Sequence, residues 1–249
     1  MDKEILWLIT ARAGSKSIKN KNIKLLNDIP LIEYRIKSAL SISKKENVWV
    51  STDSEEYAAI ARKAGATVPF IRPKKLANDT ATSNDVVLHA MDYAEKLGLN
   101  FSYIALLQPT SPFVYSSDLL SALIQLREND TAYSIVSVKE SRPNTFSIQD
   151  DSEFLDTLSK RFKKKKLVGR QQFTKQITPS GGFYISKWHK FRLEKTFYTK
   201  KTLAYLMTDE CSLDIDEPID WDLAEFFIKN KVVNTDKIII NETKSNDKY

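Results

Sequence analysis

The stretch ILWLITARAGSKSIKNKN, residues 5–22, joins an apolar run to a loop of small and basic residues. The apolar run has the β-branched and aromatic content of a buried strand. Ligands of open parallel sheets bind beyond the carboxyl ends of the strands, and small residues there let backbone N–H groups approach an anion. Three basic side chains, Arg12, Lys16 and Lys21, would neutralise its charge. We therefore expect phosphate binding at this loop; a solvated basic loop is the alternative for this composition alone.

The same order of apolar run, loop and amphipathic segment repeats along the chain. Strands are expected at residues 4–10, 47–52, 66–71, 101–107, 131–138, 181–186 and 202–207. Helices are expected at residues 30–41, 54–64, 84–97, 116–127 and 218–229. Strands that alternate with helices indicate βαβ units, and apolar strands without alternation indicate helices on both faces of a sheet. The sequence therefore predicts an α/β fold with a mostly parallel sheet.

This alternation fails between residues 140 and 179. The segment is polar and contains the run KRFKKKK at residues 160–166. We expect it to form a small lobe, residues 140–179, that is inserted into one core made of residues 1–139 and 180–240. The last residues, 241–249, are polar, and we expect them to form a flexible tail.

Composition limits the class of protein. The 249 residues are 42% hydrophobic, which is enough for one large core. No run of 18 apolar residues is present, and the N-terminal stretch is too short and too acidic for a signal peptide. The single cysteine, Cys211, cannot form an internal disulfide and fits a reducing compartment. We expect a cytoplasmic protein without a membrane partner.

The positive charge of the chain is local. The net charge is +6, and residues 160–166 hold six of the 38 basic residues, so the remaining 32 equal the 32 acidic residues. A protein that coats a polyanion carries its basic charge more widely. Nucleic acid is therefore not the partner we expect.

An acidic pair, Asp214 and Asp216 in SLDIDEP, suggests a metal site. In an extended segment both carboxylates point to one side, and hard oxygen ligands suit Mg²⁺, which binds one or two carboxylates together with substrate phosphates. An acidic strand end is the alternative for the pair taken alone. His89 and His189 lack metal-ligand spacing, and no nucleophile elbow is present, which disfavours a Ser/His/Asp hydrolase. The pattern favours metal-assisted phosphate chemistry.

Four stretches occur in a fixed order between residues 5 and 225: ARAGSKSIKNKN, IRPKKLANDTATS, LLQPTSPF and SLDIDEPIDWDLAE. They resemble the motifs A-R-x-G-S-K-G-x-x-x-K-N, R-P-x-x-L-A-x-D-x-x-x-S, L-L-Q-P-T-S-P and D-I-D-x-x-x-D of the acylneuraminate cytidylyltransferases, also called CMP-sialic acid synthetases. The resemblance implies a Rossmann-like nucleotidyltransferase core with an inserted dimerisation lobe. It also implies transfer of CMP from CTP to the C2 hydroxyl of a nonulosonic acid, with release of pyrophosphate.

The resemblance implies a role for each matching residue. The implied roles are triphosphate binding by Arg12, Lys16 and Lys21 with the backbone of Ser15; contact with cytidine or its ribose by Asn22, Arg72 and Ser83; contact with the sugar by Gln108 and Tyr184; and Mg²⁺ binding by Asp214 and Asp216. In a homodimer, Arg170 of GRQQF would reach the sugar carboxylate in the partner's site. Such a reaction depends on positioning and charge neutralisation more than on a nucleophilic side chain.

Three positions depart from the family pattern, one of them Thr145 of RPNTF, where the family often has a lysine near the start of the lobe. Ser17 replaces the glycine that follows G-S-K, and we expect it to restrict the backbone of the loop. Ser180 replaces an asparagine, and we expect it to shorten a polar contact near the sugar. The sequence does not choose among sialic, legionaminic and pseudaminic acids.

Two alternatives to this function remain open from the sequence. One is a sugar-nucleotide pyrophosphorylase that uses another nucleoside triphosphate. The other is a non-catalytic protein that binds a nucleotide, or that binds nucleic acid through the basic lobe.

Overall fold

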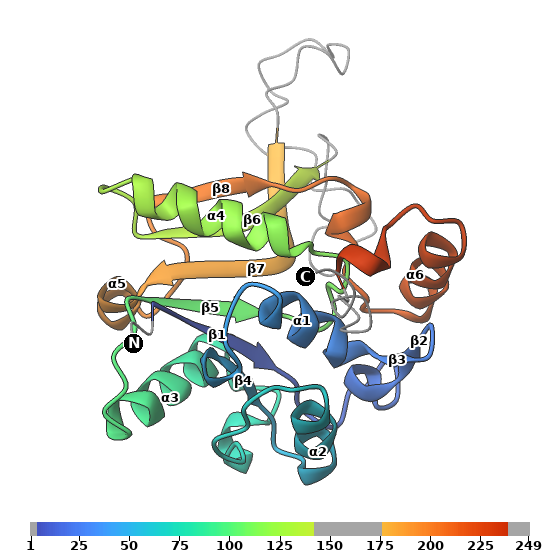
Figure 1. The fold of residues 1–249 in the computed structure, drawn as a ribbon, viewed down its shortest axis with the longest axis horizontal. Coiled ribbons are helices and arrows are strands. Elements are labelled where there is room, and N and C mark those ends of the chain that lie inside the picture. Colours follow the sequence, from blue (N-terminus) through green and yellow to red (C-terminus); the bar gives the residue numbers. More distant parts are fainter. Residues whose placement is uncertain (1–3, 142–175, 239–249) are drawn as a thin grey trace, which may run out of the picture.

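The fold is known from a computed structural model that describes residues 4–141 and 176–238. These residues contain one six-stranded sheet (Figure 1). Its strands lie in the order β4 (Val48–Ser51), β1 (Ile5–Thr10), β5 (Tyr103–Leu107), β7 (Gln176–Lys187), β6 (Ser134–Ser141) and β8 (Thr202–Leu206). β7 is antiparallel to both of its neighbours, and the other pairs are parallel. The predicted mostly parallel α/β fold is confirmed.

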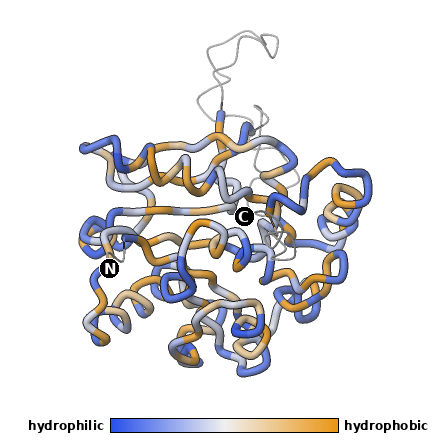
Figure 2. The backbone as a smooth tube through the Cα atoms, viewed as in Figure 1, coloured by the Kyte–Doolittle hydropathy of each residue, from blue (hydrophilic) through white to orange (hydrophobic). Residues whose placement is uncertain are grey.

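Helices cover both faces of the sheet. The helices of one face are α1 (Leu31–Leu40), α2 (Glu55–Lys63) and α4 (Ser116–Glu128); those of the other are α3 (Ser83–Lys96) and α5 (Trp188–Glu194). Alternate side chains of β1 are buried on opposite faces of the sheet. Trp7 and Ile9 belong to the core on the α1 face, and Leu6 and Leu8 belong to the core on the α3 face. The sequence of a strand that is buried on both faces is therefore a continuous run of apolar residues. Figure 2 shows hydrophobic residues along the strands and hydrophilic residues in the outer loops.

A third core lies at one end of the sheet. It packs α6 (Pro218–Lys229) against the short hairpin formed by β2 (Leu25–Leu26) and β3 (Ile29–Pro30). Trp221 of α6 and Ile215 share this core with Leu26. The packing therefore brings the segment before α6 next to the chain that follows β1. Neither the hairpin nor α5 is predicted from the sequence.

One predicted strand is wrong. Residues 66–71 form only two isolated bridges, Trp49 to Thr67 and Thr52 to Ile71. Pro69 lies between these bridges, and proline cannot donate the ladder hydrogen bond that a continuous strand would need. Short 3₁₀ helices complete the described chain at Lys21–Ile23, Lys45–Asn47, Lys74–Leu76, Glu210–Ser212 and Thr235–Lys237.

The predicted inserted lobe falls mostly outside the described residues. β6 and β7 pair as far as Ser141 and Gln176, so the described ends of the predicted lobe, residues 140–141 and 176–179, continue these two strands. The lobe at 140–179 and the tail at 241–249 stay predictions. In the described part of the chain, no helix has both the length and the apolar character that a membrane span requires.

Candidate active site

A cavity of about 540 Å³ lies beyond the carboxyl ends of β1 and β5. This is where ligands bind in open α/β sheets. The predicted site residues that line it are Arg12, Ser15, Lys16, Lys21, Asn22, Arg72, Ser83, Gln108, Asp214 and Asp216. Basic and acidic groups from distant parts of the chain therefore share one space.

The loop after β1 (residues 11–22, the β1 loop) is tied to residues 214–216 (the acidic segment). The buried Lys21 Nζ donates to the Ile215 carbonyl at 2.7 Å and lies 3.1 Å from Asp216 Oδ1. Ser17 Oγ donates to the carbonyl of Asp216. These contacts hold the β1 loop and the acidic segment side by side, so that basic and acidic groups line the same cavity.

Ser17 does not have the backbone conformation that favours glycine. Ser17 is not among the residues with positive φ, whereas Gly14 has a φ of 86°. The position in the β1 loop that favours glycine is therefore Gly14. The hydroxyl of Ser17 instead adds a bond to the acidic segment.

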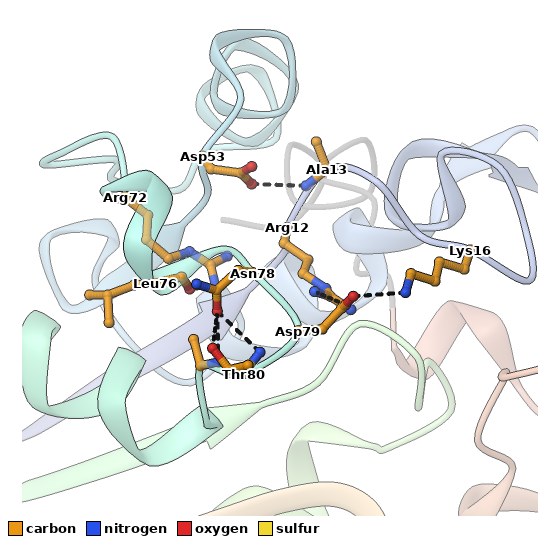
Figure 3. Close-up of polar contacts among 10 residues, drawn as sticks. Arg12, Ala13, Lys16, Asp53, Arg72, Leu76, Asn78, Asp79 and Thr80 are labelled. Atoms are coloured by element: carbon orange, nitrogen blue, oxygen red, sulfur yellow. Dashed lines mark hydrogen bonds and ion pairs between the residues drawn. The ribbon is translucent and has the colours of Figure 1, made fainter.

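Arg12 and Lys16 point toward one carboxylate, that of Asp79 (Figure 3). The distance from Arg12 Nη1 to Asp79 Oδ1 is 2.9 Å, and that from Lys16 Nζ to Asp79 Oδ2 is 2.7 Å. Hydrogen bonds from Lys16 and then Arg12 lower the pKa of Asp79. The two cations that the sequence assigns to a triphosphate thus have a carboxylate partner in the ligand-free protein.

The backbone of the β1 loop is held by Asp53, at the end of β4. The Ala13 N–H donates to Asp53 Oδ1 at 2.9 Å (Figure 3). This contact fixes the start of the β1 loop beside β4. Asp53 does not cap α2; the N-cap is Ser54, whose Oγ accepts from the Tyr57 N–H at 3.4 Å.

Arg72 and Asn22 support the walls of the cavity. Arg72 Nη2 donates to the Ser51 carbonyl at 2.8 Å, and Nη1 lies 3.5 Å from the Leu76 carbonyl. Burial lowers the pKa of Arg72 to about 10, so the side chain keeps its charge at neutral pH. Asn22 Nδ2 donates to the Arg12 carbonyl at 3.1 Å. Both side chains hold backbone in place and also line the cavity.

Asp214 is the buried member of the acidic pair. Its Oδ1 accepts from Ser111 Oγ at 3.3 Å. Burial raises the pKa of Asp214; a hydrogen bond from Thr110 opposes this rise, and the nearby charge of Asp216 adds to it. The two carboxylates are therefore close enough to repel each other.

The acidic pair fits a divalent cation. A cation would relieve the repulsion between Asp214 and Asp216, and carboxylate oxygens are ligands that Mg²⁺ prefers. The described residues contain no group of three or more His, Cys, Asp or Glu side chains that could hold a metal. Two carboxylates that need further oxygens from a bound phosphate match the way Mg²⁺ binds.

Tyr184, a predicted sugar contact, is not brought to the cavity. Tyr184 does not line it; its ring lies 5.6 Å from that of Phe197 and 6.1 Å from that of Tyr198. Ser180 is buried, and its hydroxyl donates to Ser137 Oγ at 2.8 Å. This hydrogen bond lies in the protein interior, so the hydroxyl does not form the polar contact expected near the sugar. Arg170 lies outside the described residues.

Three residues of the site are missed by reasoning from the sequence: Asp53, Asp79 and Gly181. Gly181 has a φ of 79°, and a Cβ there would lie 2.8 Å from Ser111 Oγ and 3.0 Å from Asp214 Oδ2. The glycine pair at 181–182 is visible in the sequence, but its contact with Asp214 depends on the antiparallel placement of β7 beside β5.

Replacing Gly181 with Ala is expected to displace the Asp214 carboxylate and lower turnover at least tenfold. The control is Gly98→Ala, which shares the positive φ of 68° but has no neighbour within 4 Å. Left-handed strain alone costs about 1–2 kcal/mol, so each variant should melt a few degrees lower. Thermal unfolding and steady-state rates check this. Equal rates for the two variants would remove Gly181 from the site.

Comparison with known proteins places the chain among cytidylyltransferases. The cytidylyltransferase family profile matches residues 6–237. The N-acylneuraminate cytidylyltransferase of Escherichia coli O18:K1:H7 is 35% identical over 229 residues, which cover 90% of this chain and 52% of that protein. The chain thus spans about half the length of this relative. The CMP-N,N'-diacetyllegionaminic acid synthase of Legionella pneumophila is 34% identical over 223 residues, covering 89% of this chain and 94% of that one.

Solved structures agree on the fold. A CMP:2-keto-3-deoxy-manno-octonic acid synthetase, solved in complex with CTP, aligns with a TM-score of 0.65 at 14% identity, covering 92% of this chain and 99% of that one. At this identity the similarity establishes the α/β nucleotidyltransferase fold.

Proposed function

The chain belongs to the cytidylyltransferase family, and we propose that it transfers CMP from CTP to the C2 hydroxyl of a nonulosonic acid and releases pyrophosphate. The observation that carries this proposal is the shared cavity, which is lined both by Arg12, Lys16 and Lys21 and by Asp214 and Asp216. Relatives named for N-acylneuraminate and for legionaminic acid support the acceptor class.

In this reaction the sugar oxygen forms a bond to the α-phosphorus of CTP. The bond between that phosphorus and the bridging oxygen of the β-phosphate breaks, pyrophosphate leaves, and the hydroxyl proton is released. Negative charge develops on the phosphate oxygens, and fixed cations stabilise it without reorganising. Lys21 is the cation best suited to this, because two bonds to the acidic segment hold its Nζ in place.

We propose that Asp214 and Asp216 hold a divalent cation, most simply Mg²⁺. Bound there, the cation would neutralise and orient the phosphates. The hydrogen bond from Ser111 orients the Asp214 carboxylate, and the contact with Lys21 orients that of Asp216. The chain itself therefore supplies rigid ligands on one side of the nucleotide.

We also propose a cytoplasmic homodimer. The family resemblance supports a dimer in which Arg170 of the inserted lobe reaches the sugar carboxylate in the partner's site. The lone Cys211, which is buried and free, fits a reducing compartment.

Incubation with CTP, Mg²⁺ and a panel of sialic, legionaminic and pseudaminic acids tests the function. Mass spectrometry should detect a CMP-sugar, and pyrophosphate should appear in equal amount. Parallel reactions with UTP, ATP and GTP test the nucleotide. Equal or faster turnover with one of these would instead support another sugar-nucleotide pyrophosphorylase, and no turnover on any pair would support a binding protein.

A further inference from the structure

Asp79 joins the two sides of the cavity mouth. It belongs to the segment 72–82, which connects Arg72 to α3, and its partners Arg12 and Lys16 belong to the β1 loop. The Asp79 and Lys16 side chains are 57% and 78% exposed, and that of Arg12 is 38% exposed. All three line the cavity. The two ion pairs therefore lie where a ligand enters, not in the interior.

The position of Asp79 is set by its own turn. Asn78 Oδ1 accepts from the Thr80 N–H at 3.1 Å, from Thr80 Oγ1 at 2.9 Å and from the Ala81 N–H at 2.9 Å (Figure 3). Thr82 then caps α3. A side chain of Asn that bonds the backbone ahead of it stabilises a turn without help from outside. The backbone that carries Asp79 is thus fixed by contacts that do not involve the cations.

A carboxylate and a phosphate compete for the same donors. The N–H groups of Arg12 and Lys16 that bond Asp79 are those that a triphosphate would use. Asp79 offers one negative charge, whereas a nucleoside triphosphate offers several. Exposed ion pairs are weak, so a triphosphate can replace them at small cost. This step rests on the proposed function, which places a triphosphate in the cavity.

We propose that Asp79 is a resident counter-ion that holds Arg12 and Lys16 across the cavity mouth of the nucleotide-free protein, and that the incoming triphosphate displaces it. Asp79 then lowers the affinity of the site for any polyphosphate, because each one must break both ion pairs. It also keeps the two cations directed to the mouth before the ligand arrives. The pairs can form again once pyrophosphate has left.

The test is the affinity of the full chain for inorganic tripolyphosphate, measured by isothermal titration calorimetry. Asp79→Asn keeps the shape of the side chain and removes its charge, and its dissociation constant should be about three- to tenfold lower than that of the wild type. In a Lys16→Ala background the same substitution should give a smaller gain, because one of the two pairs is already absent. An unchanged, weaker or unmeasurable affinity of Asp79→Asn would overturn the proposal.

A matched control separates displacement from net charge. Glu46→Gln also removes one exposed carboxylate, but Glu46 precedes β4, at the amino end of that strand, and does not line the cavity. Its dissociation constant should change less than twofold; a gain equal to that of Asp79→Asn would overturn the proposal. Turnover of CTP by the wild type is measured separately. If the wild type turns over CTP but Asp79→Asn does not bind tripolyphosphate more tightly, only the counter-ion role is wrong. If Asp79→Asn binds tripolyphosphate more tightly but the wild type does not turn over CTP, only the proposed function is wrong.

Discussion

Replacing Asp214 with Asn is expected to lower the rate of CMP transfer about 100-fold or more. The substitution removes one of the two carboxylates that would hold the divalent cation, and charge stabilisation of this kind contributes several kcal/mol to a phosphoryl transition state. The fold should remain, because Ser111 can donate to an amide oxygen as it does to Asp214 Oδ1. Burial disfavours the charged form of Asp214, so a neutral side chain relieves that cost. Initial rates at saturating CTP and Mg²⁺, with a thermal melt, measure both effects.

Asp222→Asn is the control for this prediction. Asp222 is an exposed acid on α6, eight positions from Asp214, and does not line the cavity. Its rate should stay within twofold of the wild type. Similar rates for the two variants would show that the acidic segment does not take part in the reaction.

Replacing Lys21 with Met should lower kcat/KM about 100-fold or more. The methionine keeps the apolar stem but removes the buried Nζ, which bonds the Ile215 carbonyl and Asp216 Oδ1. Loss of one fixed charge-stabilising donor in an enclosed site commonly costs about two to three orders of magnitude in rate. The acidic segment would also lose its connection to the β1 loop. Steady-state kinetics over a range of CTP concentrations measure the effect.

Lys24→Met tests whether position, not charge, is responsible. Lys24 lies three residues further on, is exposed, and places its Nζ 4.0 Å from the centre of the Trp221 ring. It does not line the cavity, and its substitution should change kcat/KM less than twofold. A full rate for Lys21→Met would exclude Lys21 from the reaction.

Much of the fold can be predicted from the sequence, because the spacing of hydrophobic residues and the residues that begin and end a helix depend only on neighbouring positions in the chain. The helix expected at residues 218–229 is found at Pro218–Lys229, and the one expected at 84–97 is α3, Ser83–Lys96. Strand direction is not local. The later part of β7, residues 180–186, is mostly buried like a parallel strand, and only its pairing with β5 shows that it runs the other way.

The candidate site is likewise predictable from the sequence only where local patterns determine it. The sequence predicts the cations of the β1 loop and the acidic pair, and the structure brings them to one cavity. It does not predict which carboxylate reaches the cations, because Asp79 and Arg12 are 67 residues apart and Asp79 is one of several acids near the strand ends. The same holds for Asp53, which bonds Ala13 40 residues away. Contacts of this kind depend on the packed fold, not on the local pattern.

A crystal structure of the protein with CTP and Mg²⁺ tests the central claim most directly, namely that the cavity lined by the β1-loop cations and the acidic pair holds the triphosphate. We expect the phosphates to lie in this cavity within reach of both Lys21 and the Asp214–Asp216 pair, with Asp79 no longer bonded to Arg12 and Lys16. Phosphates bound outside this cavity, or away from both Lys21 and the acidic pair, would contradict the account.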